Sequence, residues 1–294
     1  MDQAERLRNI IKANAVLESR PLARVIAVTS GKGGVGKSNT SINLAIQFQK
    51  MGKKTIILDA DFGLANIEIM FGTVPKHNLC DLIYQGMNIR EIITWGPMDV
   101  GFISGGSGIA ELSNLNKDHL AFIIRNLSEL DTIADVIIVD TSAGISDAVL
   151  EFLVASEEVL LVTTPEPTSI TDSYSLLKSL DRHPDFSSET TTVKLVANKV
   201  DNHSQGQILY DKLNAVVSRY LELPLNYLGA VPQDSQLSRA VMQQMPVSIK
   251  NPQAKSAAAY AMMAEKLIDR EQDQGVPRRG MAAFFSRIIS VKKE

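Results

Sequence analysis

The residues with the clearest chemical meaning in this chain form one glycine-rich loop. Residues 30–38 read Ser-Gly-Lys-Gly-Gly-Val-Gly-Lys-Ser and match the phosphate-binding pattern G-x-x-x-x-G-K-[ST]. Backbone N–H groups of such a loop turn inward around a phosphate, while Lys37 suits the β- and γ-phosphates and the Ser38 hydroxyl suits Mg²⁺. We predict that the loop binds a nucleotide through Gly31, Lys32, Gly33, Gly34, Val35, Gly36, Lys37, Ser38 and Asn39.

Carboxylates follow two apolar runs downstream of this loop. Asp59 ends the run Thr55–Asp59, Asp61 comes two residues later, and Asp140 ends the run Val136–Asp140. A carboxylate at the carboxyl end of a parallel strand lies where open α/β sheets bind ligands, and it can hold Mg²⁺ or orient a water. An aspartate pair there also commonly caps a helix, but the upstream phosphate loop favours the catalytic interpretation. The predicted metal-binding residues are Ser38, Asp59 and Asp140.

A doubly wound sheet would bring these residues together. From Arg24 onward, short β-branched runs alternate with longer helical stretches, which predicts an α/β fold with a mostly parallel sheet flanked by helices. The runs are apolar on successive residues, as expected of strands that are covered on both faces. The predicted strands are Val25–Thr29, Thr55–Asp59, Val100–Ser104, Val136–Asp140, Val159–Thr163, Val193–Asn198 and Tyr227–Val231.

The composition is that of a globular protein with an ample core. Of the 294 residues, 45% are apolar and 21% are charged, which excludes a disordered or coiled-coil chain. Thirty basic and thirty-three acidic side chains give a net charge of −3, so we expect no direct binding of nucleic acid. Cys80 is the single cysteine, which excludes an intramolecular disulfide. No apolar run approaches the roughly 18 residues of a spanning helix, and we expect a cytoplasmic protein.

A second lysine makes the loop motif more specific. Residues 32–38, Lys-Gly-Gly-Val-Gly-Lys-Ser, resemble the K-G-G-x-G-K-[ST] motif of the deviant Walker A ATPases of the MinD/ParA type. The resemblance implies a MinD-like P-loop fold, Mg²⁺-dependent ATP hydrolysis and a homodimer in which Lys32 touches the phosphates bound by the partner subunit. Residues 59–66 are similar to the family's D-x-D-x-G-L-x-N stretch, whose second aspartate positions the attacking water. The implied catalytic residues are Lys32, Lys37, Asp61 and Asp59.

The choice of nucleotide depends on two later segments. Residues 198–201 read Asn-Lys-Val-Asp, a pattern with which GTPases read guanine. In MinD-like families an Asn at this strand end contacts adenine, and a V-P-x-D loop, here residues 231–234, packs beside the base. The resemblance therefore implies base contacts by Asn198, Pro232 and Asp234 and favours ATP, with GTP as the alternative. Ser142 replaces the usual proline of the family's D-[ST]-P-A-G segment after the second apolar run.

Both ends of the chain carry segments outside this domain. Residues 2–8 match the D-Q-A-x-x-L-R stretch of the FlhG-type flagellar-number regulators of the same family. The resemblance implies activation of a partner GTPase through Asp2, Gln3, Leu7 and Arg8; a helix packed on its own domain is the alternative. Residues 275–294 hold five basic residues and one acidic residue, and the apolar residues among them share one helical face. We predict an anionic-membrane contact through Phe284, Phe285, Ile288 and Ile289, with docking on the protein's own core as the alternative.

The predicted organisation has four parts: a partner-activating helix over 1–20, an ATPase domain over 21–270, a linker over 271–280 and a membrane-targeting helix over 281–294. The resemblance implies a switch that controls flagellar number and placement together with the FlhF-type GTPase. Further implied partners are a flagellar transcription regulator or flagellar switch components, and the implied location is the inner face of the cell membrane, at a pole. MinD-like placement of the division site and ParA-like DNA partitioning are the alternatives.

Overall fold

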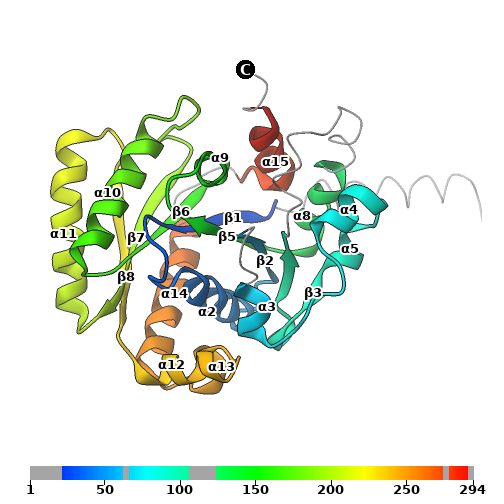
Figure 1. Cartoon of the computed structure of the whole chain (residues 1–294), viewed down its shortest axis with the longest axis horizontal. Coiled ribbons are helices and arrows are strands. Elements are labelled where there is room, and N and C mark those ends of the chain that lie inside the picture. Colours follow the sequence, from blue (N-terminus) through cyan, green and yellow to red (C-terminus); the bar gives the residue numbers. More distant parts are fainter. Residues whose placement is uncertain (1–21, 62–65, 106–123, 274–277, 291–294) are drawn as a thin grey trace, which may run out of the picture.

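One central sheet organises the molecule (Figure 1). The computed structural model describes residues 22–61, 66–105, 124–273 and 278–290. Its strands are β1 (Arg24–Ser30), β2 (Thr55–Ala60), β3 (Thr94–Trp95), β4 (Gly101–Ser104), β5 (Val136–Ala143), β6 (Glu158–Thr163), β7 (Thr192–Val200) and β8 (Leu225–Pro232). They are ordered β3-β4-β2-β5-β1-β6-β7-β8, and every neighbouring pair is parallel except β3 and β4. The predicted mostly parallel, doubly wound α/β fold is confirmed.

The seven predicted strands are all present close to their predicted bounds, and the structure adds β3. Thr94 and Trp95 of this strand pair antiparallel with Phe102 and Gly101 at the edge of the sheet. Two residues are too few to show the alternation or the apolar run from which a strand is predicted. The predicted partner-activating residues Asp2, Gln3, Leu7 and Arg8 lie outside the described residues.

Helices cover both faces of the sheet (Figure 1). Their bounds are α2 (Lys37–Lys50), α3 (Asn66–Phe71), α4 (Leu79–Gln85), α5 (Ile89–Ile92), the 3₁₀ turn η1 (Pro97–Asp99), α8 (Leu130–Ile133), α9 (Asp147–Ala155), α10 (Pro167–Asp181), α11 (His203–Tyr220), α12 (Ser235–Met242), α13 (Val247–Lys250), α14 (Lys255–Asp273) and α15 (Gly280–Ser290). The helices α2 and α14 pack in one apolar cluster, and α9, α10 and α11 pack in another. The sheet is thus the middle layer of three.

Strand β1 is buried on both faces. Ile26 and Val28 belong to the cluster that contains α2 and α14, whereas Val25 and Ala27 belong to clusters on the opposite face. This explains why the run is apolar on successive residues rather than alternating. The strand is therefore a rigid support for the loop that follows it.

The C-terminal helix α15 packs against the domain, beside α9 and α8 (Figure 1). Four large apolar residues of the helix are at most 4% exposed and join the cluster that lines this part of the sheet: Met281, Phe284, Phe285 and Ile288. The Phe284 ring stacks on the ring of Phe152 in α9, with 6.0 Å between centroids. The structure therefore shows the docked alternative rather than a free amphipathic helix, because this face of the sheet needs an apolar cover. The side chain of Ile289 lies outside the described residues.

The predicted linker is shorter than expected. Helix α14 continues to Asp273, so the predicted start of the linker at residue 271 lies within this helix. The predicted end at residue 280 is the first residue of α15. Polar composition suggested a linker here, but a polar helix end has the same composition. Among the described residues, no helix has both the length and the apolar character needed to cross a bilayer.

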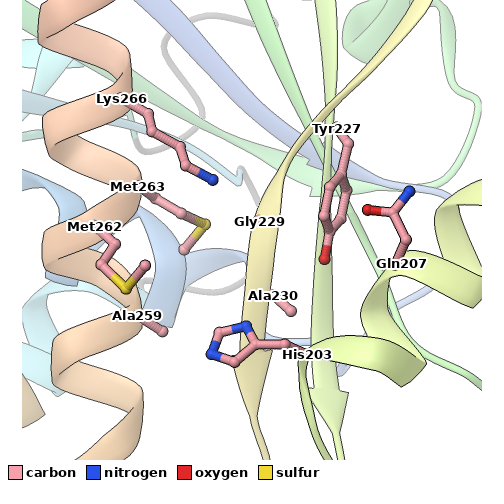
Figure 2. A pocket seen from close by; sticks show the side chains of 9 residues that line it. All are labelled: His203, Gln207, Tyr227, Gly229, Ala230, Ala259, Met262, Met263 and Lys266. Atoms are coloured by element: carbon pink, nitrogen blue, oxygen red, sulfur yellow. The ribbon is translucent and has the colours of Figure 1, made fainter.

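Lys266 of α14 contacts β8, the last strand at one edge of the sheet. A cavity of about 160 Å³ lies between α11, β8 and α14. Figure 2 shows Lys266 extending from α14 toward the strand, and its Nζ donates to the carbonyl oxygen of Leu228 at 3.1 Å. Lys266 thus occupies a backbone acceptor of β8, the last strand in the sheet order, from a neighbouring helix.

Candidate nucleotide-binding site

The phosphate loop joins the carboxyl end of β1 to the first turn of α2. Two of its glycines have positive φ, +76° at Gly34 and +100° at Gly36. A Cβ at Gly36 would lie 2.3 Å from Nδ2 of Asn198, and a Cβ at Gly31 would lie 2.3 Å from backbone atoms of Asp172. The loop is therefore held closely between α10 and the end of β7, and these positions require glycine.

The two lysines of the loop have different surroundings. Lys37 is the first residue of α2 and is almost fully buried, as expected for a lysine at the base of a phosphate site. Lys32 is exposed and pairs within its own chain: its Nζ donates to Glu166 Oε2 at 2.9 Å and to Thr168 Oγ1 at 3.0 Å. The nearby ammonium lowers the pKa of Glu166. The predicted reach of Lys32 into a partner subunit would require this pair to separate.

Two carboxylates lie side by side at the ends of β2 and β5, because Asp59 and Asp140 are paired in the strand register. Asp140 is fully buried; one carboxylate oxygen accepts a 2.7 Å hydrogen bond from Ser41 Oγ, and Oδ2 has no hydrogen-bond partner. Burial raises the pKa of Asp140, while the hydroxyls of Ser38 and Ser41 and the charge of Lys37 oppose the rise. A buried carboxylate oxygen normally has a partner, so this oxygen is a position that a cation or a water in its shell would fit.

This arrangement fits Mg²⁺ bound together with a nucleotide. Mg²⁺ is usually held by one or two protein groups and takes its other ligands from phosphate oxygens and water. Asp140 and the Ser38 hydroxyl supply such groups, and the described residues contain no cluster of three or more His, Cys, Asp or Glu that could bind a metal unaided. The predicted metal residues Ser38 and Asp140 are thus brought together.

The sequence position of Asp59 allowed two interpretations, a helix cap and a carboxylate of the nucleotide site, and its surroundings fit both. Its carboxylate accepts hydrogen bonds from the backbone N–H groups of Asp61 at 3.1 Å and Ile67 at 3.3 Å, so it caps the start of α3. Burial, and then the negative charge of Asp140, raise the pKa of Asp59 to about 7. The side chain is therefore half protonated near neutral pH when no cation is bound.

Asp61 is oriented by a residue whose role the sequence did not reveal. One carboxylate oxygen accepts from Ser142 Oγ at 3.3 Å, and the other accepts from Asn66 Nδ2 at 3.4 Å. Ser142 stands where the family pattern has proline, which has no hydroxyl. The serine in place of proline was the signal in the sequence that could have revealed this role. Its hydroxyl donates a hydrogen bond to Asp61, the predicted water-positioning carboxylate.

Asn198 braces the phosphate loop. Its Nδ2 donates to the carbonyl oxygen of Val35 at 2.6 Å, and its Oδ1 accepts from the N–H of Lys199 at 2.9 Å. The Lys199 ammonium also donates to the carbonyl oxygen of Gly34 at 2.8 Å. The Asn198 side chain therefore couples the end of β7 to the loop, and its predicted contact with the base stays a prediction.

Asp234 caps a helix in this structure. Its Oδ1 accepts from the N–H of Gln236 at 2.8 Å, and its Oδ2 accepts from both the N–H and the hydroxyl of Ser256. These bonds tie the start of α12 to α14. Base contacts by Asp234 and by Pro232, at the end of β8, also stay predictions.

The loop, the buried aspartates and the parallel sheet together define a P-loop nucleotide-binding protein. Residues 26–247 match the model of the CobQ/CobB/MinD/ParA nucleotide binding domain. The chain therefore belongs to the MinD/ParA family of nucleotide-binding ATPases.

Relatives place the chain in the flagellar branch of that family. It is 38% identical over 266 residues to the antiactivator FleN of Pseudomonas aeruginosa, covering 90% of this chain and 93% of FleN. It is 32% identical to the flagellum site-determining protein YlxH of Helicobacter pylori over 98% of both chains. The resemblance to FlhG-type proteins is thereby confirmed.

Solved structures agree with the fold. The cell division ATPase MinD of Pyrococcus furiosus superposes with a TM-score of 0.65 at 24% identity, over 85% of this chain and 100% of that chain. MinD of Pyrococcus horikoshii, solved with Mg-ADP, gives 0.65 at 21% identity over 88% of this chain and 100% of that chain. The predicted MinD-like architecture is confirmed.

Proposed function

We propose that the protein is an ATP-dependent dimerising switch that controls the number and placement of flagella. The observation that carries the proposal is a complete phosphate loop with a second, exposed lysine, Lys32, in a chain similar to FleN and YlxH. Lys37 is buried, whereas Lys32 is held by an exposed ion pair with Glu166 and an exposed hydrogen bond to Thr168, so it could turn to another site.

The site supports ATP hydrolysis within each subunit. We propose that the loop N–H groups, Lys37 and the Ser38 hydroxyl hold the phosphates, with Asp140 in the shell of Mg²⁺. Mg²⁺, when bound, neutralises charge that develops on the phosphates. Asp61 is proposed to orient the attacking water, since its partly exposed carboxylate is already fixed by Ser142.

Membrane attachment is proposed to follow release of α15. The apolar side chains needed for the membrane, among them Phe284 and Phe285, are buried in the docked helix, where each contributes about 1.5–3 kcal/mol. A bilayer interface offers the same residues another apolar environment. One short helix is a weak anchor, so pairing two tails in an ATP-bound dimer would raise avidity steeply.

The partners follow from the relatives and from the N-terminal motif. FleN is named an antiactivator and YlxH a flagellum site-determining protein, which supports a flagellar transcription regulator or flagellar switch components as partners. The D-Q-A-x-x-L-R stretch supports activation of the FlhF-type GTPase, with Gln3 as the residue that helps to orient water in the partner site. Division-site placement and DNA partitioning are the competing functions.

The two lysines provide the direct test of the switch. Lys37→Ala should lose nucleotide binding, whereas Lys32→Ala should bind ATP and remain monomeric. Size-exclusion chromatography with light scattering, run with ATP and Mg²⁺, measures the mass of each variant, and Lys212→Ala on the exposed face of α11 is the matched control. A Lys32→Ala chain that dimerises like the parent would contradict the cross-subunit role.

The flagellar role is tested in cells. A strain that lacks the protein should carry an altered number of flagella, and the parent gene should restore the count where the Lys37→Ala gene does not. Normal flagella with misplaced division septa would favour the division-site function instead. A peptide of residues 1–20 should stimulate the FlhF-type GTPase, and Gln3→Ala should weaken that stimulation; equal stimulation by both peptides would remove Gln3 from this role.

A further inference from the structure

The two ends of the described chain meet at the amino end of β1, opposite the phosphate loop. Residues 1–21 join the domain at Leu22, immediately before β1. The entry to α15 lies beside the same point, because the Arg278 guanidinium donates to the carbonyl oxygen of Leu22 at 2.8 Å. The segment assigned to partner activation and the helix assigned to the membrane therefore leave the domain from one place.

Asp131 of α8 bonds to both ends at once. Its carboxylate accepts from the N–H of Ala23 at 3.2 Å and from the N–H of Met281 at 3.1 Å. The turn before Met281 fits closely around this carboxylate: Gly280 has φ of +69°, and a Cβ there would lie 2.6 Å from Asp131 Oδ2. Burial raises the pKa of Asp131, so the carboxylate depends on these N–H groups when it is ionised.

A second carboxylate repeats this arrangement. Glu157, in the turn before β6, accepts from the N–H of Arg279, and its hydrogen-bond partners also include the N–H groups of Val25 and Gly280. Each carboxylate thus joins residues at or just before the start of β1 to residues at or just before the start of α15. If α15 were released, each carboxylate would lose the hydrogen bonds that it accepts from the backbone N–H groups of this segment.

Apolar packing connects the same two segments. Ala23 and Val25 are buried in the cluster that contains Met281, Phe284 and Phe285. Removal of α15 would therefore expose the start of β1 to water and also remove the bond from Arg278 to Leu22. The start of β1 and the helix form one cooperative unit.

We propose that Asp131 couples the start of β1 to the C-terminal helix, so that release of α15 also loosens Leu22 and Ala23, the residues that precede β1. When α15 is docked, both residues are held by its hydrogen bonds and packing; when α15 is released, these contacts are lost. This inference rests on the proposed function for the meaning of the two segments. The coupling itself depends only on the contacts around Asp131, Glu157 and α15.

Hydrogen–deuterium exchange on the full-length chain tests the coupling without lipid. Gly280→Ala places a Cβ against Asp131 and should raise exchange in residues 280–288. Exchange at Ala23 and Val25 should rise with it by about tenfold, the effect of losing one hydrogen bond to a charged group. Gly52→Ala is the matched control, because Gly52 also has positive φ, +76°, but has no atom within 4 Å of the added Cβ. Unchanged nucleotide affinity shows that each variant is folded.

Asp131→Asn tests the joint itself. The amide that replaces the carboxylate keeps one acceptor oxygen, but its NH₂ group would face a backbone N–H, and two donors repel. Exchange should therefore rise both at Ala23 and Val25 and in residues 280–288. Asp181→Asn is the control: this carboxylate also accepts from a backbone N–H, that of Glu222, but it lies at the end of α10. Wild-type protection of Ala23 and Val25 while residues 280–288 exchange freely, in either Gly280→Ala or Asp131→Asn, would overturn the coupling.

A lipid arm separates this inference from the proposed function. Vesicles of phosphatidylglycerol and phosphatidylethanolamine, added with ATP and Mg²⁺, should raise exchange in both segments of the unmodified chain. No change with vesicles, together with coupled exchange in Gly280→Ala, would refute membrane release and leave the coupling intact. Vesicle-induced exchange confined to residues 278–290 would refute the coupling.

Discussion

The two ends of the sheet use buried and half-buried carboxylates in opposite ways. At the carboxyl ends of the strands, Asp140 keeps one oxygen without a hydrogen-bond partner beside a glycine-rich loop. At the amino end of β1, Asp131 and Glu157 accept hydrogen bonds from backbone N–H groups of the chain's own ends. Burial raises the pKa of all three carboxyl groups, so each needs a partner when ionised.

The difference indicates where each partner comes from. At the nucleotide end the proposed partner, a nucleotide with Mg²⁺, is external, and its binding should stabilise the fold. At the other end the partner is part of the chain, and its departure should destabilise the fold. Four predictions test or sharpen this contrast.

Removal of the Asp61 carboxylate is expected to have the largest effect on the nucleotide end. In Asp61→Ala, ATP hydrolysis should fall about 10²- to 10⁴-fold, the usual contribution of a group that orients or deprotonates a nucleophile. ATP affinity should stay unchanged because the phosphate loop is intact. Single-turnover phosphate release and equilibrium binding measure the two quantities, with Asp211→Ala on α11 as a control. Hydrolysis at the parent rate would assign the water to another group.

Truncation of a tail aromatic tests the other end. Phe285→Ala should lower the free energy of unfolding by about 3–5 kcal/mol, as expected for an aromatic ring in a packed core. Chemical denaturation of the full chain measures this change. Tyr220→Ala, at an exposed aromatic position on α11, should change it by no more than about 0.5 kcal/mol. Equal effects of the two substitutions would show that α15 is not part of the core in solution.

The pKa of Asp59 predicts a pH dependence without nucleotide. Because folding raises this pKa from 3.8 to about 7, the folded state binds the proton more tightly, and ionisation costs stability. The contribution of Asp59 is fully present below pH 4 and is lost as the pH rises through 7. Thermal unfolding of the nucleotide-free chain between pH 5 and 8 should show this fall, and Asp59→Asn should flatten it. A slope identical in both proteins would locate the proton elsewhere.

The Ser142 hydroxyl is expected to have the smallest effect. Ser142→Ala should lower the hydrolysis rate about two- to tenfold, since one hydrogen bond to Asp61 contributes about 0.5–1.5 kcal/mol. Ser142→Pro introduces the usual residue of the family pattern. Both variants lack the hydroxyl but only proline stiffens the loop, so a comparison of the two separates the loss of the hydroxyl from a change in loop stiffness. The measurement is the maximal rate at saturating ATP. Full activity in both variants would show that the Ser142 hydroxyl is not needed to orient Asp61, and Asn66 would be the remaining donor to its carboxylate.

The nucleotide end was largely predictable from sequence because its signals are local. The spacing from Gly31 to Ser38 and the acids at the ends of apolar strands are short patterns, and adjacent strands brought Asp59 and Asp140 into register as expected. The bond between Asp234 and Ser256 was not visible, since Ser256 lies in another helix, α14. Such contacts depend on how the helices pack and not on the local sequence.

The C-terminal helix shows where a correct local pattern left the outcome open. The amphipathic face of α15 is present as predicted, but amphipathicity states only that one face avoids water. A membrane and a protein core satisfy that requirement equally. The choice was decided by Phe152 and the other residues of the cluster it belongs to, which come from distant parts of the chain.

In the proposed dimer, the ion pair between Lys32 and Glu166 would also affect how two copies of the protein meet. An isolated lysine on each loop would give both approaching surfaces the same charge, and these charges would repel at distances up to the Debye length, about 8 Å at physiological ionic strength. Glu166 compensates that charge until contact is made. The pair is exposed, so salt weakens it readily and little holds the lysine back once a phosphate is near. Glu166→Gln should therefore slow association at low ionic strength, and added salt should restore the rate.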